Sequence, residues 1–276
     1  SGGSIVEIDK GNIDFLQIIS GTFNAEYGQA QSGIINVVSG GPGEKYSGSV
    51  ALYTGTYYSA NNIFLGLNKF RPSNELNVEG SLSGPVPSVS SFGFYVFGRF
   101  NADNGYLFGK RLTTPQDAFP VAAYREWYRR EFPNTPAAVN NAIPIPDSLL
   151  TGDGSFVAMN PRRKISFNTK LLYRLSSEIK TAYSVFVENE NGREYDDAYR
   201  YDPDGLPNIE HDASTHILKV NHVLENNLFY DVNLSYMRRS SNRFLYENLV
   251  DPRYQTQFPS IDRFHLGGTT IGKLFF

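Results

Sequence analysis

A strict alternation of apolar and polar residues constrains the fold of this chain more than any other feature. The clearest case is the segment 164–176, where Ile165 and Phe167 share one face of an extended chain and Ser166 lies on the other. A period of two over about ten residues is the pattern of a half-buried β-strand. Seven segments show it: residues 46–57, 74–84, 92–103, 164–176, 179–190, 214–224 and 228–239. The sequence therefore predicts an all-β fold.

The lengths of these segments and of their connections favour a membrane β-barrel over a soluble sheet. Strands of soluble proteins cluster near about 5–6 residues, whereas a strand that crosses a bilayer at about 45° needs roughly 9–11. The connections also alternate, as outer-membrane barrels require, with short turns on one rim and long loops on the other. The short connections are residues 85–91, 176–178 and 225–227, and the long ones are about 58–73, 104–163 and 191–213.

Seven strands are too few to enclose a plugged lumen, since plugged barrels have about 22 strands. We therefore expect residues 44–276 to form the first seven or so strands of a large antiparallel transmembrane β-barrel, with a further extracellular loop over residues 241–276. The polar faces would line the lumen and the apolar faces would contact lipid. Closing the wall removes unpaired strand edges, which hydrocarbon does not tolerate.

Composition excludes several other classes of protein. The chain has a net charge of −3 and no cysteine, so disulfide frameworks, thiolate metal sites and thiol nucleophiles are excluded. The lack of a basic block argues against a nucleic-acid partner. No apolar run reaches the length of about 18 residues that marks a transmembrane helix. A soluble β-rich binding protein remains an alternative to the barrel.

The segment that precedes the strands is punctuated by glycines and small residues. Residues 6–41 resemble the end of the plug domain of TonB-dependent outer-membrane receptors, in the form common in Bacteroidetes-like bacteria. Ser39-Gly40-Gly41 departs from the family pattern, in which Thr-Lys is more usual. The positions that match the family motif are Gly21, Ala25, Tyr27, Gly28, Ser32, Gly33, Ile34, Ile35, Asn36, Val37 and Val38.

This resemblance implies that residues 1–43 are the C-terminal part of a plug domain. It also implies active, TonB-dependent import of a nutrient (a siderophore, vitamin, glycan or peptide) across the bacterial outer membrane, without a cofactor. The implied partners are outer-membrane lipid, TonB through a part outside this chain, the nutrient, and a surface lipoprotein. The opening Ser-Gly-Gly-Ser is typical of a mid-chain start, so we expect a signal peptide and TonB box upstream. The alternative is a plugged barrel with a structural or secretion-associated role.

Six residues of the motif are candidates for a hinge between plug and wall. Gly28 and Gly33 can adopt positive φ and allow close backbone approach. Asn36 places an amide in an otherwise apolar strand, where we expect a buried hydrogen-bond partner. The alternative is that these residues only shape the plug. The six are Glu26, Tyr27, Gly28, Ser32, Gly33 and Asn36.

Glu26 carries a charge that needs a partner if it is buried. We expect it to pair with a basic residue of the polar face. Three residues are suitable: Arg99, Lys170 and Arg174.

The longest loop contains a possible substrate-contact helix. Pro120 can open a helix over residues 121–132, with Tyr124, Tyr128 and Phe132 spaced at i, i+4 and i+8. As a functional surface, this aromatic stripe with its arginines suits sugars, peptides or another anionic or ring-bearing ligand. As structure, it would pack onto the rest of the loop. The candidate contacts are Tyr124, Arg125, Trp127 and Tyr128.

Metal and catalytic sites are not expected. Asp202-Pro203-Asp204-Gly205 lacks the full oxygen-ligand spacing of a calcium loop. Glu210-His211-Asp212 with His216 lacks the paired spacing of a zinc site. No Gly-x-Ser-x-Gly elbow, phosphate loop or His-Glu-x-x-His motif occurs, so the sequence does not predict an enzyme.

Overall fold

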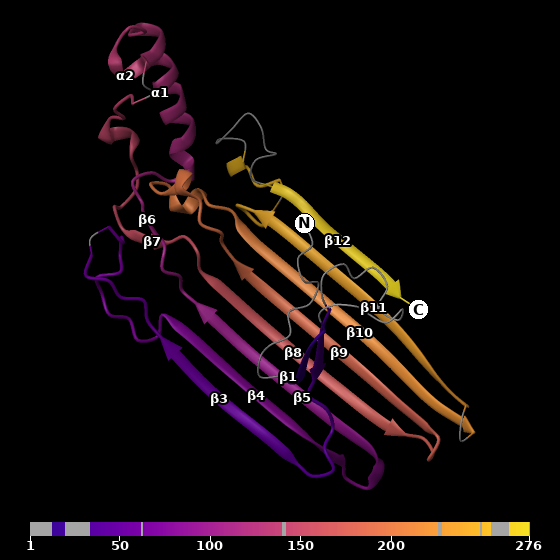
Figure 1. Ribbon diagram of the computed structural model, residues 1–276. Coiled ribbons are helices and arrows are strands. Elements are labelled where there is room, and N and C mark those ends of the chain that lie inside the picture. The colour runs from indigo at the N-terminus through magenta and orange to yellow at the C-terminus, as the bar shows by residue number, and fades with distance from the viewer. Residues whose placement is uncertain are drawn as a thin grey trace.

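The computed structural model describes residues 13–19, 34–61, 63–139, 142–225, 228–248, 250–254 and 265–275. They form one eight-stranded sheet and two small two-stranded sheets, and every strand pair is antiparallel. The predicted all-β class is confirmed. Figure 1 shows the large sheet as one broad, open layer from which a helix projects at one end.

The large sheet is a meander in which each strand pairs with the next along the chain, apart from one excursion between β5 and β8. Among the described residues β3 and β12 are its two edges, and the sheet is not closed into a barrel. Its strands are β3 (Ser47–Gly55), β4 (Glu75–Val86), β5 (Val89–Asp103), β8 (Arg162–Arg174), β9 (Ile179–Gly192), β10 (Asn208–Glu225), β11 (Leu228–Phe244) and β12 (His265–Phe275).

All seven expected strands are present. The expected connection 85–91 is shorter, because β4 runs to Val86 and β5 begins at Val89, and two larger regions also differ from the sequence-based prediction. The expected loop 241–276 contains an eighth strand, β12. Its glycines at 267, 268 and 272 interrupt the alternation of apolar and polar residues. The strand is held extended by its ladder with β11, which the sequence pattern does not reveal. β10 begins at Asn208 instead of residue 214, so the expected loop 191–213 is shorter. In the first residues of β10, His211 interrupts the face that holds Ile209 and Ala213, and ladders to β9 and β11 hold the segment extended.

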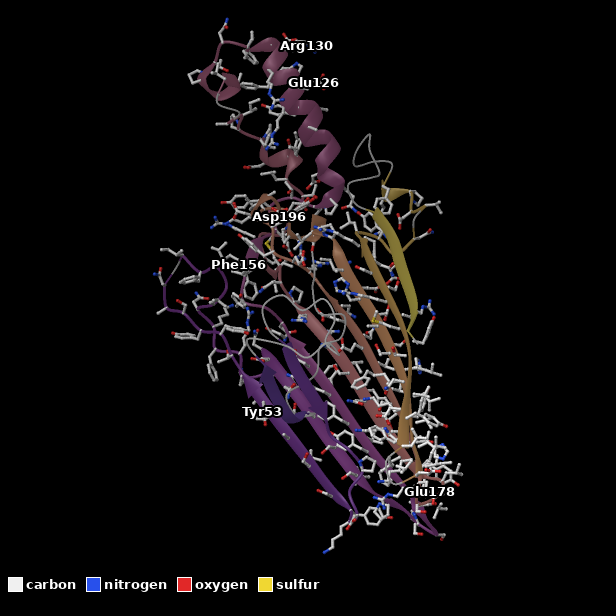
Figure 2. The ribbon with its side chains drawn as sticks, turned by 45° about the vertical axis from the view of Figure 1, so that its right-hand side comes forward. Tyr53, Glu126, Arg130, Phe156, Glu178 and Asp196 are labelled. Carbon is white, nitrogen blue, oxygen red and sulfur yellow. The ribbon has the colours of Figure 1, made fainter. Side chains whose placement is uncertain are left out.

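Short turns and long loops lie at opposite ends of the sheet (Figures 1 and 2). The turns β4–β5, β8–β9 and β10–β11 meet at the end where Figure 2 labels Glu178, which we call the turn end. The longer connections gather at the end where Figure 2 labels Phe156 and Asp196, which we call the loop end. The predicted sorting of connections by length is confirmed.

Exposure on β8 is the reverse of that in a soluble protein. Lys164 and Asn168 are only 8% and 5% exposed. The intervening Ile165 and Phe167 are 53% and 43% exposed. We call the face that holds Ile165 and Phe167 the apolar face, and the face that holds Lys164, Ser166 and Asn168 the polar face.

The same arrangement continues on the neighbouring strands. Register pairs Phe100 with Ile165 and Val78 with Phe100 on the apolar face, and all three side chains are exposed. On the polar face, Tyr95 and Phe97 are buried. Aliphatic and aromatic residues therefore lie exposed on the open side of the sheet, while the covered side holds charged and amide residues together with the buried rings of Tyr95 and Phe97.

The chain that enters the sheet lies on the polar face. β1 (Ile13–Ile19) and β2 (Ile34–Ser39) form an antiparallel pair, drawn in front of the large sheet in Figure 1. Gly40 follows β2 and is buried. A Cβ placed on Gly40 would stand 2.7 Å from the Tyr95 hydroxyl oxygen, so this backbone packs directly on the aromatic ring.

The loops at the loop end form a structured unit. We define the cap as residues 104–161 and 193–207. No helix in the described part of the chain is both long and apolar enough to cross a membrane. The cap contains β6 (Phe108–Lys110), η2 (Pro115–Asp117), α1 (Ala118–Glu131), α2 (Pro136–Val139), η3 (Asp147–Leu149), β7 (Phe156–Ala158), η4 (Asp197–Tyr199) and η5 (Pro203–Gly205).

The driest packing in the described residues is in this cap. Met159, Pro203 and Leu206 are its fully buried side chains. Burying a large apolar side chain stabilises by about 1.5–3 kcal/mol, so the cap has a core of its own. The sheet, by contrast, leaves its apolar face uncovered.

Candidate functional site

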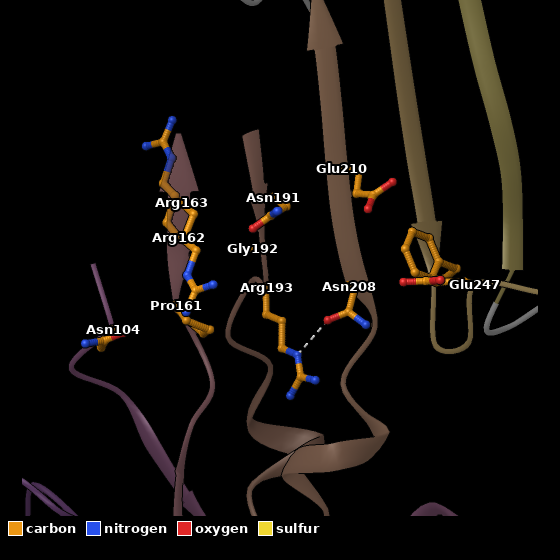
Figure 3. A pocket seen from close by; sticks show the side chains of 11 residues that line it. Asn104, Pro161, Arg162, Arg163, Asn191, Gly192, Arg193, Asn208, Glu210 and Glu247 are labelled. Atoms are coloured by element: carbon orange, nitrogen blue, oxygen red, sulfur yellow. Dashed lines mark hydrogen bonds between the residues drawn. The ribbon is translucent and has the colours of Figure 1, made fainter. Parts of the chain in front are cut away.

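A pocket with a largely charged and polar lining lies at the base of the cap. It has a volume of about 460 Å³ and lies where β8, β9, β10 and β11 meet the loops. Figure 3 shows the pocket, with the side chains of Arg193 and Asn208 turned toward one another. Its charged lining consists of Arg162, Arg163, Arg193, Glu210 and Glu247.

Arg193 is the most enclosed cation of this loop-end pocket. Its Nε donates to Asn208 Oδ1 at 2.9 Å, and its Nη1 donates to the Pro203 carbonyl oxygen at 3.3 Å. Burial lowers the pKa of Arg193, and the charge of Asp204 opposes that shift. An arginine stays protonated in proteins. Both of these hydrogen-bond partners are neutral, and the charge of Asp204 acts on the guanidinium without a hydrogen bond to it among the described contacts.

The neighbouring Arg162 is already engaged. Its Nε lies 2.6 Å from Glu190 Oε1, and its Nη2 donates to Glu190 Oε2 at 2.7 Å. This bidentate geometry is the preferred pairing of a guanidinium with a carboxylate. Arg163 is exposed and lies one residue further along β8. Guanidinium, carboxylate and amide groups together suit a ligand rich in hydrogen-bonding groups.

The four candidate contact residues all lie on α1. We predicted a helix over 121–132, and the structure has one over Ala118–Glu131. The earlier start is compatible with Pro120, because the first four backbone N–H groups of a helix have no intrahelical partner. In Figure 2 α1 projects from the loop end, with Glu126 and Arg130 toward its far end.

The aromatic stripe of α1 packs mainly on itself. The ring centroids of Tyr124 and Trp127 lie 5.5 Å apart, and those of Tyr128 and Phe132 lie 5.1 Å apart. Trp127 and Phe132 remain exposed. Arg125 instead lines a second pocket between α1 and the loop 193–207. The structure therefore brings Tyr124, Trp127 and Tyr128 together and assigns Arg125 to a different site.

This second pocket, the cap pocket, has a volume of about 430 Å³ and contains two carboxylates, those of Asp117 and Asp202. Asp117 accepts the backbone N–H of Thr114 at 2.8 Å, and both the N–H and the hydroxyl of Thr151 at 3.1 and 2.8 Å. Burial acts to raise the pKa of Asp117, but these hydrogen bonds outweigh it and lower that pKa below its usual value. Asp117 is therefore ionised.

Asp202 has a less favourable environment. Burial first, and then the negative charges of Asp204 and Asp117, raise its pKa to about 6, although the Gly205 amide partly offsets this. Its Oδ1 is buried and accepts no hydrogen bond among the described residues. An ionised carboxylate with an unfilled oxygen in a low-dielectric site costs free energy unless a partner satisfies it.

The two halves of the cap are joined around Arg111. Its Nη1 donates to Ser155 Oγ at 2.9 Å and to Asp153 Oδ2 at 3.1 Å, and its Nη2 donates to Asp204 Oδ1 at 3.2 Å. The backbone N–H of Lys110 also donates to the carbonyl of Arg200 at 2.8 Å. These bonds hold the walls of the cap pocket in register.

Most of the candidate hinge residues lie outside the described residues: Glu26, Tyr27, Gly28, Ser32 and Gly33. Asn36 lies in β2, in register with Gln17 of β1. Arg99, an expected partner for Glu26, lies 3.7 Å from Glu79 and donates to Asn77. The hinge and its ion pair stay predictions.

Both histidines of the segment 210–216 lie in β10. Within the part of the chain that the structure describes, no group of three or more His, Cys, Asp or Glu residues is placed to hold a metal ion. His216 lies within the expected strand 214–224, as predicted. It lies in β10, with its Nδ1 2.8 Å from the Tyr183 hydroxyl oxygen and its ring stacked on Tyr183.

Sequence reasoning missed both pockets. Their walls come from segments that are distant in the chain, such as residues 112–125 and 198–202 in the cap pocket. The acidic residues of the expected loop 191–213 were the one feature of the sequence that pointed to the cap pocket. Comparison with protein-family models, with curated proteins and with solved structures finds no match to this chain.

Proposed function

We propose that this chain forms part of the wall and the end of the plug of an outer-membrane β-barrel, which imports a nutrient in a TonB-dependent manner. The observation that carries the proposal is the reversed exposure of β8, where Ile165 and Phe167 lie open while Lys164 and Asn168 are buried. Water makes an apolar surface of this extent unfavourable, by about 25 cal/mol per Å². Lipid removes that cost.

The shape of the apolar face supports the same proposal. We call the unburied large apolar or aromatic residue nearest the loop end on this face of each strand the border of the apolar face. On β5 and β8 the border residues, Phe100 and Ile165, are directly paired. Ile165 then faces the polar Asn189, and the apolar run of β9 begins two residues on, at Val187. Val187 in turn faces the polar Ser214.

The border therefore moves again, by two residues, to His216 on β10, which faces Tyr236 on β11. It shifts four residues over four strand-to-strand steps. Strands that cross a slab at about 35–45°, with about 4.8 Å between strands and about 3.3 Å per residue, shift the border by about one residue per strand. The apolar face thus has the slant of a tilted sheet crossing a flat layer.

Aromatic residues with polar tips lie at both borders of this band. At the loop-end border, the ring of His216 lies 6.2 Å from that of Tyr183 and 6.3 Å from that of Tyr236. At the turn end, His222 Nδ1 lies 2.9 Å from the Tyr230 hydroxyl oxygen. Such rings are typical of the girdles that flank the lipid-facing band of outer-membrane barrels.

The resemblance of residues 6–41 to a plug, and their position before the sheet, support import over a purely structural role. The polar face beneath the leading segment carries charges, such as the Lys164–Glu188 pair at 3.5 Å. A polar interface can separate more readily than a dry core, because water replaces each lost hydrogen bond.

The experiment is to measure uptake of labelled siderophores, vitamins, glycans and peptides in cells that carry the protein, with and without an intact TonB system. Import predicts uptake of one class that requires both the protein and TonB. Uptake that persists without TonB, or no uptake by an outer membrane that contains the protein, favours the structural or secretion-associated role.

A further inference from the structure

The cap pocket has the size and walls of a small-molecule site. Its volume of about 430 Å³ lies within the range of about 300–1,000 Å³ that ligand pockets occupy. Leu112, Val121, Ile145 and Leu150 supply its aliphatic walls. Arg111 joins the segments around Ser155 and Asp204, and Asp117 at the start of α1 is bonded to Thr114 and Thr151, so the pocket is formed before any ligand arrives.

The net charge of the cap pocket favours a positively charged ligand. Asp117 and Asp202 line it, and Arg125 is its one lining cation among the described residues. The hydrogen bonds that Asp117 accepts come from neutral donors, Thr114 and Thr151. Neither carboxylate is bonded to a cation within the described residues, so the pocket carries net negative charge.

Asp202 also has capacity for a further hydrogen bond. Its Oδ1 is buried without a donor in the described part of the chain. Arg111, which stabilises the adjacent Asp204, is already shared between Asp204 and Asp153. No cation among the described residues is hydrogen-bonded to Asp202, so a bound ligand can supply the positive charge that its surroundings lack.

We infer that the cap pocket binds a small organic ammonium ion, with the ammonium on Asp202 and the apolar body against Leu112, Val121, Ile145 and Leu150. Hydrogen bonds between charged groups are about twice as strong as neutral ones, and apolar walls strengthen them by excluding water. An anion is repelled by the two carboxylates. A neutral molecule of the same shape gains only the contact with the walls.

This site goes beyond the proposed function and does not depend on it. The cap has its own apolar core, and all the named residues that line the pocket belong to the cap. The ligand can be the imported nutrient or a separate effector, and the chemistry of the site is the same in both cases. A failure to bind ammonium ions would leave TonB-dependent uptake of another nutrient unaffected.

The test compares two probes of nearly equal shape on the purified full chain: 2-phenylethylammonium and 2-phenylethanol. Their dissociation constants are measured by ligand-observed NMR at pH 7.5. We expect the ammonium to bind about tenfold more tightly than the alcohol, as one charge-assisted hydrogen bond would give. Equal binding of the two probes, or binding of neither, would overturn the inference.

Variants assign the binding to the pocket. Asp202→Asn keeps the shape of the side chain but removes its charge, and we expect the preference for the ammonium to fall below about twofold. Asp197→Asn is the matched control, because Asp197 lies in the same loop, is exposed and is outside the pocket lining. Val121→Trp fills the pocket and should abolish binding of both probes.

A loss of preference in Asp202→Asn could also arise from a collapsed cap. Hydrogen exchange of the amides of Lys110, Leu112 and Thr113 checks this, because they donate across the cap to the carbonyl oxygens of Arg200 and Tyr201. We expect their protection to be retained in Asp202→Asn while the ammonium preference is lost. Retention of the preference in Asp202→Asn, or its loss in Asp197→Asn, would overturn the inference.

Discussion

Lys164 and Ile165 are neighbours on β8, yet the lysine is 8% exposed and the isoleucine is 53% exposed. The lysine lies 3.5 Å from Glu188 on the polar face. The isoleucine lies on the opposite face, beside Phe100 and Phe167. A soluble sheet would bury the isoleucine and expose the lysine. The reversed exposure of this pair means that the apolar face of the sheet requires an apolar environment.

A charge placed on the apolar face should prevent membrane assembly. We expect Phe167→Arg, two residues inside the loop-end border of the apolar band, to cost about 1–3 kcal/mol, between the values for an interface and for the bilayer midplane, because an arginine facing lipid loses its hydration. The measurement is the fraction of protein that is folded and protease-resistant in the outer membrane. Glu178→Arg, in the turn after β8, is the control and should have no effect. Full assembly of Phe167→Arg would contradict the lipid-facing assignment.

A side chain at residue 40 should separate the leading segment from the sheet. A Cβ on Gly40 would come within 2.6–2.7 Å of the ring and hydroxyl of Tyr95, closer than van der Waals contact allows. We expect Gly40→Val to make cells several-fold more sensitive to an antibiotic too large for porins. Tyr95→Ala, which removes the ring, should partly restore the barrier in the double variant.

Gly98→Ala is the matched control for this prediction, because a Cβ there meets nothing within 4 Å. It should leave the antibiotic sensitivity unchanged. Equal sensitivity of Gly40→Val and the unaltered protein would show that the contact with Tyr95 does not seal the polar face.

The stability of the cap should change with pH through Asp202. A carboxyl whose pKa is raised by folding binds its proton more tightly in the folded state, so its contribution favours folding at low pH. That contribution is lost as the pH rises from about 4 to about 6, the raised pKa of Asp202. Above pH 7 the buried charge destabilises the cap, by about 1–3 kcal/mol after allowance for solvent screening.

Asp202→Asn should therefore slow hydrogen exchange in residues 198–206 at pH 7.5 and change it little at pH 4. The two pH values are compared in the same variant, after correction for intrinsic exchange rates. An exchange rate at pH 7.5 that equals that of the unaltered protein would argue against a buried, ionised Asp202.

Arg111 should couple the two halves of the cap. Its guanidinium bonds to Asp153, Ser155 and Asp204. Arg111→Ala removes charge-assisted bonds worth about 1.5 kcal/mol or more, which corresponds to about tenfold faster exchange. We expect the faster exchange both in residues 110–113 and in residues 198–206. Arg130→Ala, on the exposed end of α1, should change neither.

The sequence predicted those parts of the fold that depend on near neighbours along the chain. The alternation through Ile165 and Phe167 is a property of one strand, so it identifies the strand and both of its faces. The helix near Pro120 follows equally from local spacing. β12 was missed because its glycines carry little pattern, and its extended form depends on pairing with β11.

The site was harder to predict, because its parts meet only in three dimensions. Arg111 and Asp204 are 93 residues apart in the chain, and no periodicity links them. The unfilled oxygen of Asp202 is likewise visible only once the cap has formed around it. Arg125 was chosen for its place beside an aromatic stripe, and the fold turns it toward the acidic pocket instead.

The most direct test of the central claim is the environment of residue 167. The chain has no cysteine, so Phe167→Cys and Glu178→Cys each accept a single nitroxide label in the membrane-reconstituted protein. Collision rates with oxygen, which concentrates in lipid, and with a water-soluble nickel chelate are then measured by electron paramagnetic resonance. We predict that oxygen dominates at residue 167 and the chelate at residue 178. Dominance of the nickel chelate at residue 167 would contradict the account.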